Sequence, residues 1–130
     1  ECKEAEIQEN EEGVYFEATI QNNGNLHKRK IRISDRDIIK IEICDDLELS
    51  KDTKKVEQIF MLGTECRWME DACINIGKHM LNIKSTAQME KETTCCATGY
   101  NDISNTTKFK CSVSQITDSK VTIVTTIVID

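Results

Sequence analysis

Cysteine is the residue type in this chain with the widest choice of chemistry. Seven cysteines occur among the 130 residues, namely Cys2, Cys44, Cys66, Cys73, Cys95, Cys96 and Cys111. Such side chains form disulfides, bind zinc or act as nucleophiles. Paired zinc ligands are usually separated by about two to four residues. The gap between Cys66 and Cys73 is longer, and Cys95 is adjacent to Cys96, so the spacing favours disulfides over a metal site.

The segment from Cys66 to Cys96 holds four of these cysteines and the only tryptophan. We expect all four to be bridged, because each native disulfide typically adds about 2–4 kcal/mol to the stability of a chain with a thin core. The sequence leaves the pairing open. An odd cysteine in a secreted chain is either buried and inert or bonded to a second chain. A disulfide-linked homodimer or heterodimer and a monomer with one free thiol are therefore both open.

The sequence predicts no catalytic residues. It has no Cys-x-x-Cys motif and no serine in a Gly-x-Ser-x-Gly motif, and His27 and His79 lack a supporting context. Adjacent acids such as Asp45 and Asp46 are typical of a solvated surface. We therefore predict that the chain is not an enzyme and that it has no cofactor and no metal. A hydrolase that uses two carboxylates is an alternative, which two acids converging in a deep pocket would favour.

Several features favour a secreted chain. The cysteine content indicates an oxidising compartment, and Asn105-Thr106-Thr107 is a glycosylation sequon. The first residue is Glu1 rather than methionine, as expected after removal of a signal peptide, although a fragment boundary would look the same. No apolar run approaches the roughly 18 residues of a membrane span. The net charge of −6 argues against nucleic acid as a partner.

Period-two alternation of apolar residues predicts strands over 14–20, 26–34 and 39–43. Asn23 and Gly24 separate the first two, and Asn-Gly supplies the positive φ angles of a tight hairpin turn. Residues 109–113 and 121–129 read as a second hairpin, whose last strand is apolar on both faces and so belongs inside a sheet or at an interface.

Other segments are expected to differ from this pattern. Residues 1–12 are rich in glutamate and should be loosely ordered, tethered mainly through Cys2. The spacing of Val56, Ile59 and Phe60 predicts a short helix over 50–63, and 66–76 is either a second helix or a strand and loop. The fold class is therefore a single, mainly β, disulfide-rich domain of residues 1–130, with hairpins and one or two short helices.

The one local excess of positive charge lies on the second predicted strand. Lys28, Lys30 and Arg32 alternate along it and so point to one side. Together with the hairpin tip at Asn23 and Gly24, this ridge is a candidate surface for an acidic receptor or a sulfated glycan. The alternative is an edge strand that lysines keep from aggregating.

The stretch Glu92–Asn101 reads ETTCCATGYN and resembles the C-terminal signature of three-finger (snake-toxin-like) domains and of the nematode ET module. Those signatures contain Cys-Cys, a short polar run and then Cys-Asn. Here Tyr100 or Asn101 replaces the last cysteine, and the N-terminal paired cysteines of three-finger domains are missing. The resemblance implies hairpin fingers on a disulfide knot that act by binding proteins, and it carries over no catalytic residue.

We therefore expect a non-enzymatic module that recognises another extracellular or cell-surface protein, as a ligand, a decoy or a receptor-like domain. Rigid loops on a cross-linked frame suit this role because little ordering entropy is lost on binding. A protease inhibitor is the alternative, in which the segment Ser85–Thr94 would form a disulfide-braced loop that enters an active site.

Alkylation of free thiols followed by intact-mass measurement, with and without reduction, tests the disulfide expectation. A bridged monomer reacts at no more than one thiol before reduction, and a covalent dimer has a non-reducing mass near twice 14.8 kDa. Alkylation of all seven cysteines without reduction would contradict the disulfide-framed interpretation.

Overall fold

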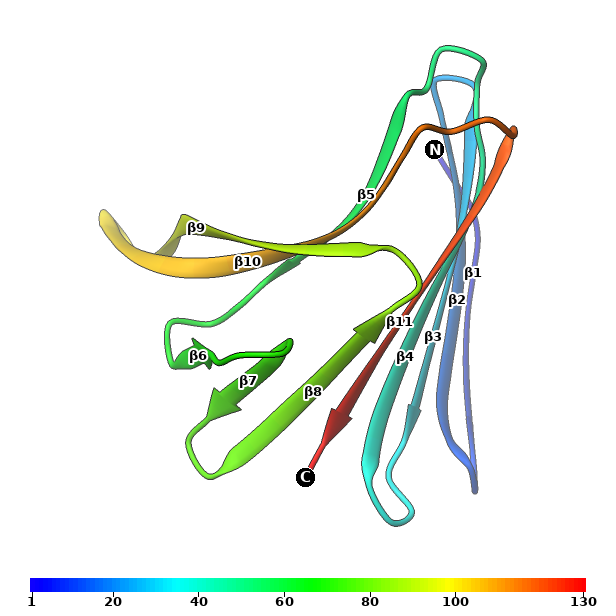
Figure 1. The fold of residues 1–130 in the computed structure, drawn as a ribbon. Coiled ribbons are helices and arrows are strands. Elements are labelled where there is room, and N and C mark those ends of the chain that lie inside the picture. The colour runs from blue at the N-terminus through cyan, green and yellow to red at the C-terminus, as the bar shows by residue number, and fades with distance from the viewer.

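The chain folds into two antiparallel sheets with no helix (Figure 1). The structure is a computed structural model that describes residues 1–130. The eight-stranded sheet has the order β1-β2-β3-β4-β11-β8-β7-β6, and the three-stranded sheet has the order β5-β10-β9. The strands are β1 (Cys2–Asn10), β2 (Gly13–Asn22), β3 (Asn25–Ser34), β4 (Ile39–Glu48), β5 (Lys55–Met61), β6 (Cys66–Trp68), β7 (Cys73–Ile76), β8 (His79–Ser85), β9 (Gln88–Gly99), β10 (Asp102–Ser114) and β11 (Lys120–Ile129). The prediction of a mainly β fold is confirmed, and no helix is present that could cross a membrane.

The three strands predicted near the N-terminus, and the hairpin between the first two, are confirmed. Asn23 and Gly24 have φ angles of 48° and 78°, as the hairpin turn between β2 and β3 requires. The expectation of a loosely ordered N-terminus is not met, because β1 pairs along its length with β2. Every residue of β1 is nevertheless exposed, so backbone pairing rather than side-chain burial holds this strand.

The helix predicted over 50–63 is wrong, since this segment contains β5. The inward-facing residues are Val56, Gln58 and Phe60, while Ile59 is 51% exposed. Because the middle residue of this inward-facing row is a glutamine, the apolar residues of β5 do not alternate with a period of two in the sequence. Tertiary hydrogen bonds satisfy that glutamine, and they cannot be read from the local sequence.

The segment 66–76 forms strands β6 and β7 rather than a helix. Asp71 and Ala72 in the connecting turn have φ angles of 53° and 56°, a left-handed conformation that a right-handed helix cannot contain. Of the two interpretations of this segment, the strand-and-loop alternative is therefore the correct one.

The second predicted hairpin is wrong in its pairing. β10 lies between β5 and β9, whereas β11 lies between β4 and β8 in the other sheet. The chain crosses from one sheet to the other after Ser114, where Gln115 has a φ of 63°. The expectation that the last strand is internal to a sheet is confirmed, and it agrees with the apolar residues on both faces of that strand.

The core occupies only one half of the sandwich. Its buried members are Ile74, Ile83, Phe109, Cys111 and Ile123, from β7, β8, β10 and β11. The ring of Phe109 stacks on Phe60 at 4.4 Å and meets the Trp68 ring at 5.6 Å. No residue of β1, β2 or β3 belongs to this core or packs against it. The three-stranded sheet therefore covers the half of the large sheet that contains β6, β7, β8 and β11.

A buried carboxylate marks the border of the covered half. Asp45 on β4 is 3% exposed. Its oxygens accept hydrogen bonds from the Nε and Nη2 atoms of Arg29, each at 2.7 Å, and from Nε2 of Gln58 at 2.7 Å. Nε2 of His27 lies 2.8 Å from Oδ1. Gln58 in turn accepts a hydrogen bond from Thr125 on β11. The cluster thus joins β3, β4 and β11 of the large sheet to β5 of the small one.

The electrostatics of Asp45 follow from these contacts. Burial acts to raise the pKa of the Asp45 carboxyl, but hydrogen bonds from Arg29, His27 and Gln58 outweigh burial, and the pKa lies far below its usual range. Asp45 therefore remains ionised at all ordinary pH values, and its charge is matched by that of Arg29.

Replacement of Asp45 by asparagine is expected to lower the free energy of unfolding by about 2–4 kcal/mol near pH 7, because Arg29 loses its buried partner. The matched control is Asp46→Asn, since Asp46 pairs with Lys30 where both side chains are more than a third exposed. We expect that control to lose less than about 1 kcal/mol. Urea unfolding of the three proteins measures both differences.

The pH dependence of the same comparison is a second readout. Because the folded pKa of Asp45 is depressed, its stabilising contribution is complete above the unfolded value of about 3.9 and decreases as the pH falls below it. The difference between the wild type and Asp45→Asn should narrow between about pH 5 and about pH 2. An unchanged difference over that range would contradict this account.

Candidate functional site

An apolar face of the large sheet extends beyond the core. Ile7 of β1 lies opposite Phe16 of β2, which lies opposite Ile31 of β3, which lies opposite the buried Ile43 of β4. This register places the alternating apolar side chains of all four strands on the side of the large sheet that faces the small sheet. We call these side chains the open face; it comprises Ala5, Ile7, Val14, Phe16, Ala18, Ile20, Ile31, Ile33, Ile39 and Ile41.

No second layer lies over the open face, and five of its ten side chains are exposed while the other five are half-buried. Ile7 is 72% exposed, Ile20 45%, Ile39 43% and Ile33 38%. Figure 1 shows β5, β9 and β10 standing over the side of β8 and β11, away from β1 and β2. Large contiguous apolar patches are uncommon on monomeric proteins and usually mark an interaction surface. The open face is therefore the candidate functional site.

Sequence reasoning found the strands of this site but not the site itself. The alternation in 14–20, 26–34 and 39–43 correctly indicated one apolar side. It could not indicate which half of the sheet the small sheet covers, because that depends on where β5 crosses. The exposed Ile7 was missed because its glutamate-rich surroundings obscured a strand pattern.

The cluster around Asp45 lies next to the open face but does not have the geometry of a catalytic site. His27 contacts Asp45 through Nε2. The nearby Thr125 hydroxyl donates to Gln58 and lies 3.0 Å from the hydroxyl oxygen of Ser85. No buried side-chain nitrogen or oxygen lacks a hydrogen-bond partner. The cluster is satisfied internally and acts as a tie between the sheets.

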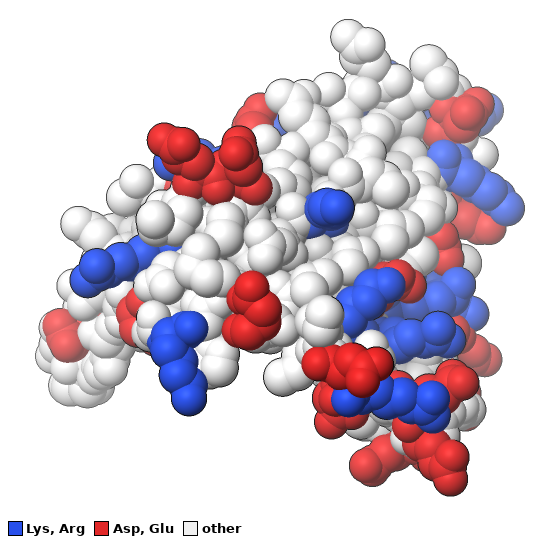
Figure 2. Space-filling model, turned by 60° about the horizontal axis from the view of Figure 1, so that its bottom comes forward, with Lys and Arg blue, Asp and Glu red and all other residues white.

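The basic residues of β3 lie on the opposite, outer side of the sheet. Lys28 forms an ion pair with Glu17, and Lys30 Nζ lies 3.0 Å from Asp46 Oδ2. Figure 2 shows a group of Lys and Arg side chains at the lower right that is bordered by Asp and Glu side chains. The alternative interpretation as an edge strand is wrong, because β3 pairs with both β2 and β4. Carboxylates from neighbouring strands neutralise much of the predicted ridge.

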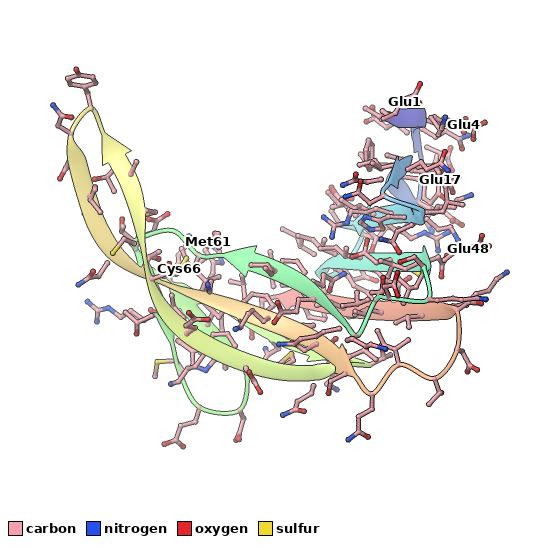
Figure 3. All side chains as sticks on the ribbon, turned by 90° about the horizontal axis from the view of Figure 1, so that it is seen from above. Glu1, Glu4, Glu17, Glu48, Met61 and Cys66 are labelled. Carbon is pink, nitrogen blue, oxygen red and sulfur yellow. The ribbon has the colours of Figure 1, made fainter.

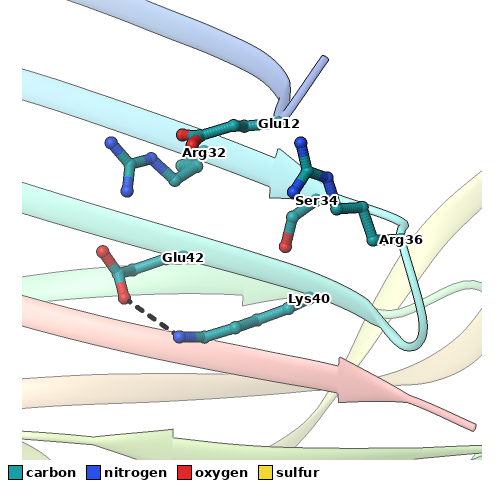
Figure 4. Close-up of a pocket in the computed structure, with 6 residues that line it drawn as sticks. All are labelled: Glu12, Arg32, Ser34, Arg36, Lys40 and Glu42. Carbon is teal, nitrogen blue, oxygen red and sulfur yellow. Dashed lines mark ion pairs between the residues drawn. The ribbon is translucent and has the colours of Figure 1, made fainter.

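Arg32 lines a shallow depression near the β3–β4 turn (Figure 4). Its volume is about 270 Å³, and its walls are formed by Glu12, Arg32, Ser34, Arg36, Lys40 and Glu42. Lys40 pairs with Glu42 at 3.5 Å, and Arg36 donates to the backbone oxygen of Glu11 at 3.1 Å. Ligand pockets are usually lined mainly by apolar side chains. This depression has no apolar wall, so it is a weaker candidate than the open face.

All seven cysteines are thiols in the structure. Cys66 on β6 packs against the core, whereas the register of β6, β7 and β8 places Cys73 on the other side of the sheet. Cys95 and Cys96 are adjacent on β9 and so point to opposite sides. The expected bridges among these four cysteines stay a prediction. No group of three or more His, Cys, Asp and Glu side chains is placed to hold a metal ion.

The remaining cysteines lie in three different environments. Cys2 is exposed on β1, Cys44 is half-buried on β4, and Cys111 is fully buried in the core. Burial, assisted by the charge of Asp46, raises the pKa of the Cys44 thiol. Thiols with raised pKa values are poor nucleophiles at neutral pH.

The other predicted positions do not converge on the open face. Asn105 is exposed on β10 and accepts a hydrogen bond from Cys95 at 3.5 Å. Asn23 and Gly24 form the hairpin tip, where Asn25 accepts a hydrogen bond from the backbone nitrogen of Ser50 at 2.7 Å. The tip is thus anchored to the loop that leads to β5.

The segment Ser85–Thr94 does not form the loop that an inhibitor would need. Ser85 ends β8, and β9 begins at Gln88. Only Thr86 and Ala87 connect the two strands, and Ala87 packs against the core. The geometry of this segment therefore gives no support to protease inhibition.

Comparison with known proteins gives a likeness of fold only. No protein-family model and no curated protein sequence matches the chain. Among solved structures it is similar to heparinase III (BT4657 gene product), with a TM-score of 0.76 and 17% identity, over 100% of this chain and 22% of that chain. It is also similar to the same protein with methylated lysines, with a TM-score of 0.71 and 17% identity, over 93% of this chain and 20% of that one. The chain thus spans about a fifth of the length of the structures it matches and shares the fold of that part.

Proposed function

We propose that the chain is a non-enzymatic β-sandwich module that binds another protein surface through the open face. The observation that carries this proposal is the row of exposed isoleucines on β1–β4 beside an otherwise filled core. Complete burial of one isoleucine or phenylalanine side chain contributes about 1.5–3 kcal/mol. Covering the open face would therefore contribute several such increments, which is enough to drive association.

The fold likeness supports a setting for this contact. The match covers 22% of the chain of the solved structure. A sandwich of this kind therefore exists there as one part of a larger protein. A module of this fold would place its open face against a neighbouring domain or a separate protein. The seven cysteines and the Asn105 sequon support a location outside the cell.

A second candidate is a non-catalytic part of a glycan-cleaving protein. The fold likeness to heparinase III, an enzyme whose name denotes action on heparin, favours it. The ion pairs of Lys28 and Lys30 argue against direct contact between the ridge and a sulfated glycan. Affinity of the isolated chain for a heparin column in about 0.15 M salt, lost in an Arg32→Ala variant, would favour this candidate over the first.

Photo-crosslinking tests the protein-binding proposal with adjacent positions as matched controls. A photoreactive residue replaces Ile20 on the open face or Gln21, which lies on the outer side of the same strand. Each protein is returned to material from its natural source. We expect a specific protein adduct from position 20 and little from position 21, and equal yields at the two positions would contradict the proposal.

The identified protein is then used for affinity measurements. Charges on the open face, Ile7→Glu with Ile20→Glu, should weaken binding about 100-fold, because each charge must be desolvated in the contact. The matched outer-face pair is Gln8→Glu with Gln21→Glu, and it should change affinity less than about threefold. Since Ile7 and Ile20 are exposed in the free chain, both pairs should unfold at similar urea concentrations.

A further inference from the structure

The strand β5 is an edge strand whose outer side has no partner. It pairs with β10 alone, in a continuous register from Lys55–Ser114 to Met61–Lys108. Beyond its end, the backbone nitrogen of Leu62 donates to the oxygen of Thr107 at 3.0 Å. Because backbone groups alternate in direction along an antiparallel strand, those of Phe60, Gln58 and Val56 also face β10. The N–H and C=O groups of Glu57, Ile59 and Met61 therefore face away from it.

The free edge of β5 borders the open face. Gln58 in the middle of β5 bonds Asp45 on β4, while Cys111 opposite it on β10 contacts Thr125 on β11 at 3.6 Å. The small sheet thus follows the order of the large sheet below it, with β10 over β11 and β5 over β4. A strand added to the small sheet beside β5 would therefore lie over β3. Figure 3 shows β5, ending at Met61, with β1–β3 rising beside it and no strand on that side.

The other edge strands are irregular, short or carry a charged run, which discourages pairing, whereas the charged side chains of β5 are confined to Lys55 and Glu57. β1 has an irregular register between Cys2 and Glu4 and a row of glutamates. β6 has only three residues. β9 has the charged run Glu90–Glu92. β5 has no irregularity, and its outward side chains Ile59 and Met61 are each 51% exposed. A regular edge with apolar side chains is suited to accept a strand.

We infer that the partner binds by adding a β-strand to the free edge of β5, as the fourth strand of the small sheet. This inference rests on the proposed function and specifies how the open face is covered. Backbone groups of Glu57, Ile59 and Met61 pair with the added strand, and every second side chain of that strand points onto the open face. The added strand thus extends the small sheet and buries the open face beneath it.

The surface below the added strand defines its chemistry. Ile31 and Ile33 require apolar side chains above them. Arg29 and His27 continue the same row of β3, and their side chains are about one-third exposed. The added segment therefore carries apolar residues on its inner side, and an aspartate or glutamate as a hydrogen-bond acceptor where it passes the exposed parts of the Arg29 and His27 side chains.

A second copy of this chain fits the position poorly. Two β5 edges could pair in two ways. In the first, both large sheets would lie on the same side of the joined small sheets. In the second, the outer surface of one copy's small sheet would lie on the open face of the other copy. That outer surface carries the ion-paired Lys110, Glu57 and Glu92, and their burial against isoleucines would be unfavourable. A separate extended segment meets neither obstacle.

Amide hydrogen exchange of the free protein tests the geometry. The amides of Glu57, Ile59 and Met61 should exchange at least tenfold faster than those of Val56, Gln58 and Phe60, which face β10. Uniform protection along β5 would overturn the inference at this first step.

Binding is tested with a displayed library of linear 12-residue peptides selected on the wild-type chain. The inference expects enriched peptides with alternating apolar residues and one acid, and at least tenfold slower exchange of the Ile59 and Met61 amides when such a peptide is bound. Ile59→Pro removes the outward N–H, and Ile59→Thr keeps it. The proline variant should lose at least tenfold in affinity, and the threonine variant should lose less than threefold. Circular dichroism and the exchange rate of the Phe60 amide establish that both variants are folded.

The outcomes separate this inference from the proposed function. Peptides that lose affinity with Ile7→Glu and Ile20→Glu but keep it with Ile59→Pro would show docking on the open face without strand addition, and would overturn the inference alone. Peptides affected by neither change would overturn both. Failure to enrich any peptide with the alternating pattern would overturn the inference, as would concentration-dependent dimers of the free chain that Ile59→Pro abolishes.

Discussion

The hydrogen-bonded carboxylate of Asp45 is the interaction on which the arrangement of the two sheets depends. Arg29, His27 and Gln58 reach it from β3 and β5, and Gln58 extends the cluster to Thr125 on β11. A buried charge is tolerated only when its partners are in place, so the cluster fixes where β5 crosses the large sheet. That crossing point decides which strands lie under cover and which remain open.

The consequence is a sandwich that is filled on one side and incomplete on the other. On the filled side Phe60, Phe109 and Trp68 pack in contact, as in an ordinary domain core. On the other side the same large sheet continues its apolar rows onto β1–β3 without a second layer above them. The proposed function and the strand-addition site both follow from this asymmetry. A partner that supplies the missing layer would bind to an open face and a free β5 edge that are both already formed in the isolated chain.

Local patterns predicted the parts of the fold that local chemistry determines. Asn23 and Gly24 fixed the first hairpin, and the isoleucines of 39–43 fixed a strand with one apolar side. The error over 50–63 came from Gln58, whose partner Asp45 is distant in the sequence. The pairing of β10 and β11 was wrong because a turn signal does not reveal that the chain changes sheets. The open face was missed for the same reason, since exposure of Ile7 or Ile33 depends on an absent layer and not on the strand itself.

Hydroxyl-radical footprinting tests the central claim most directly, by comparing the isolated chain with the protein assembled in its natural source. Side chains on the open face, such as Ile7, Phe16 and Ile33, should be oxidised several-fold less in the assembled protein. Tyr100, which is 97% exposed at the far β9–β10 turn, provides the internal reference and should react equally in both. Equal oxidation of the open face in the two samples would contradict the account.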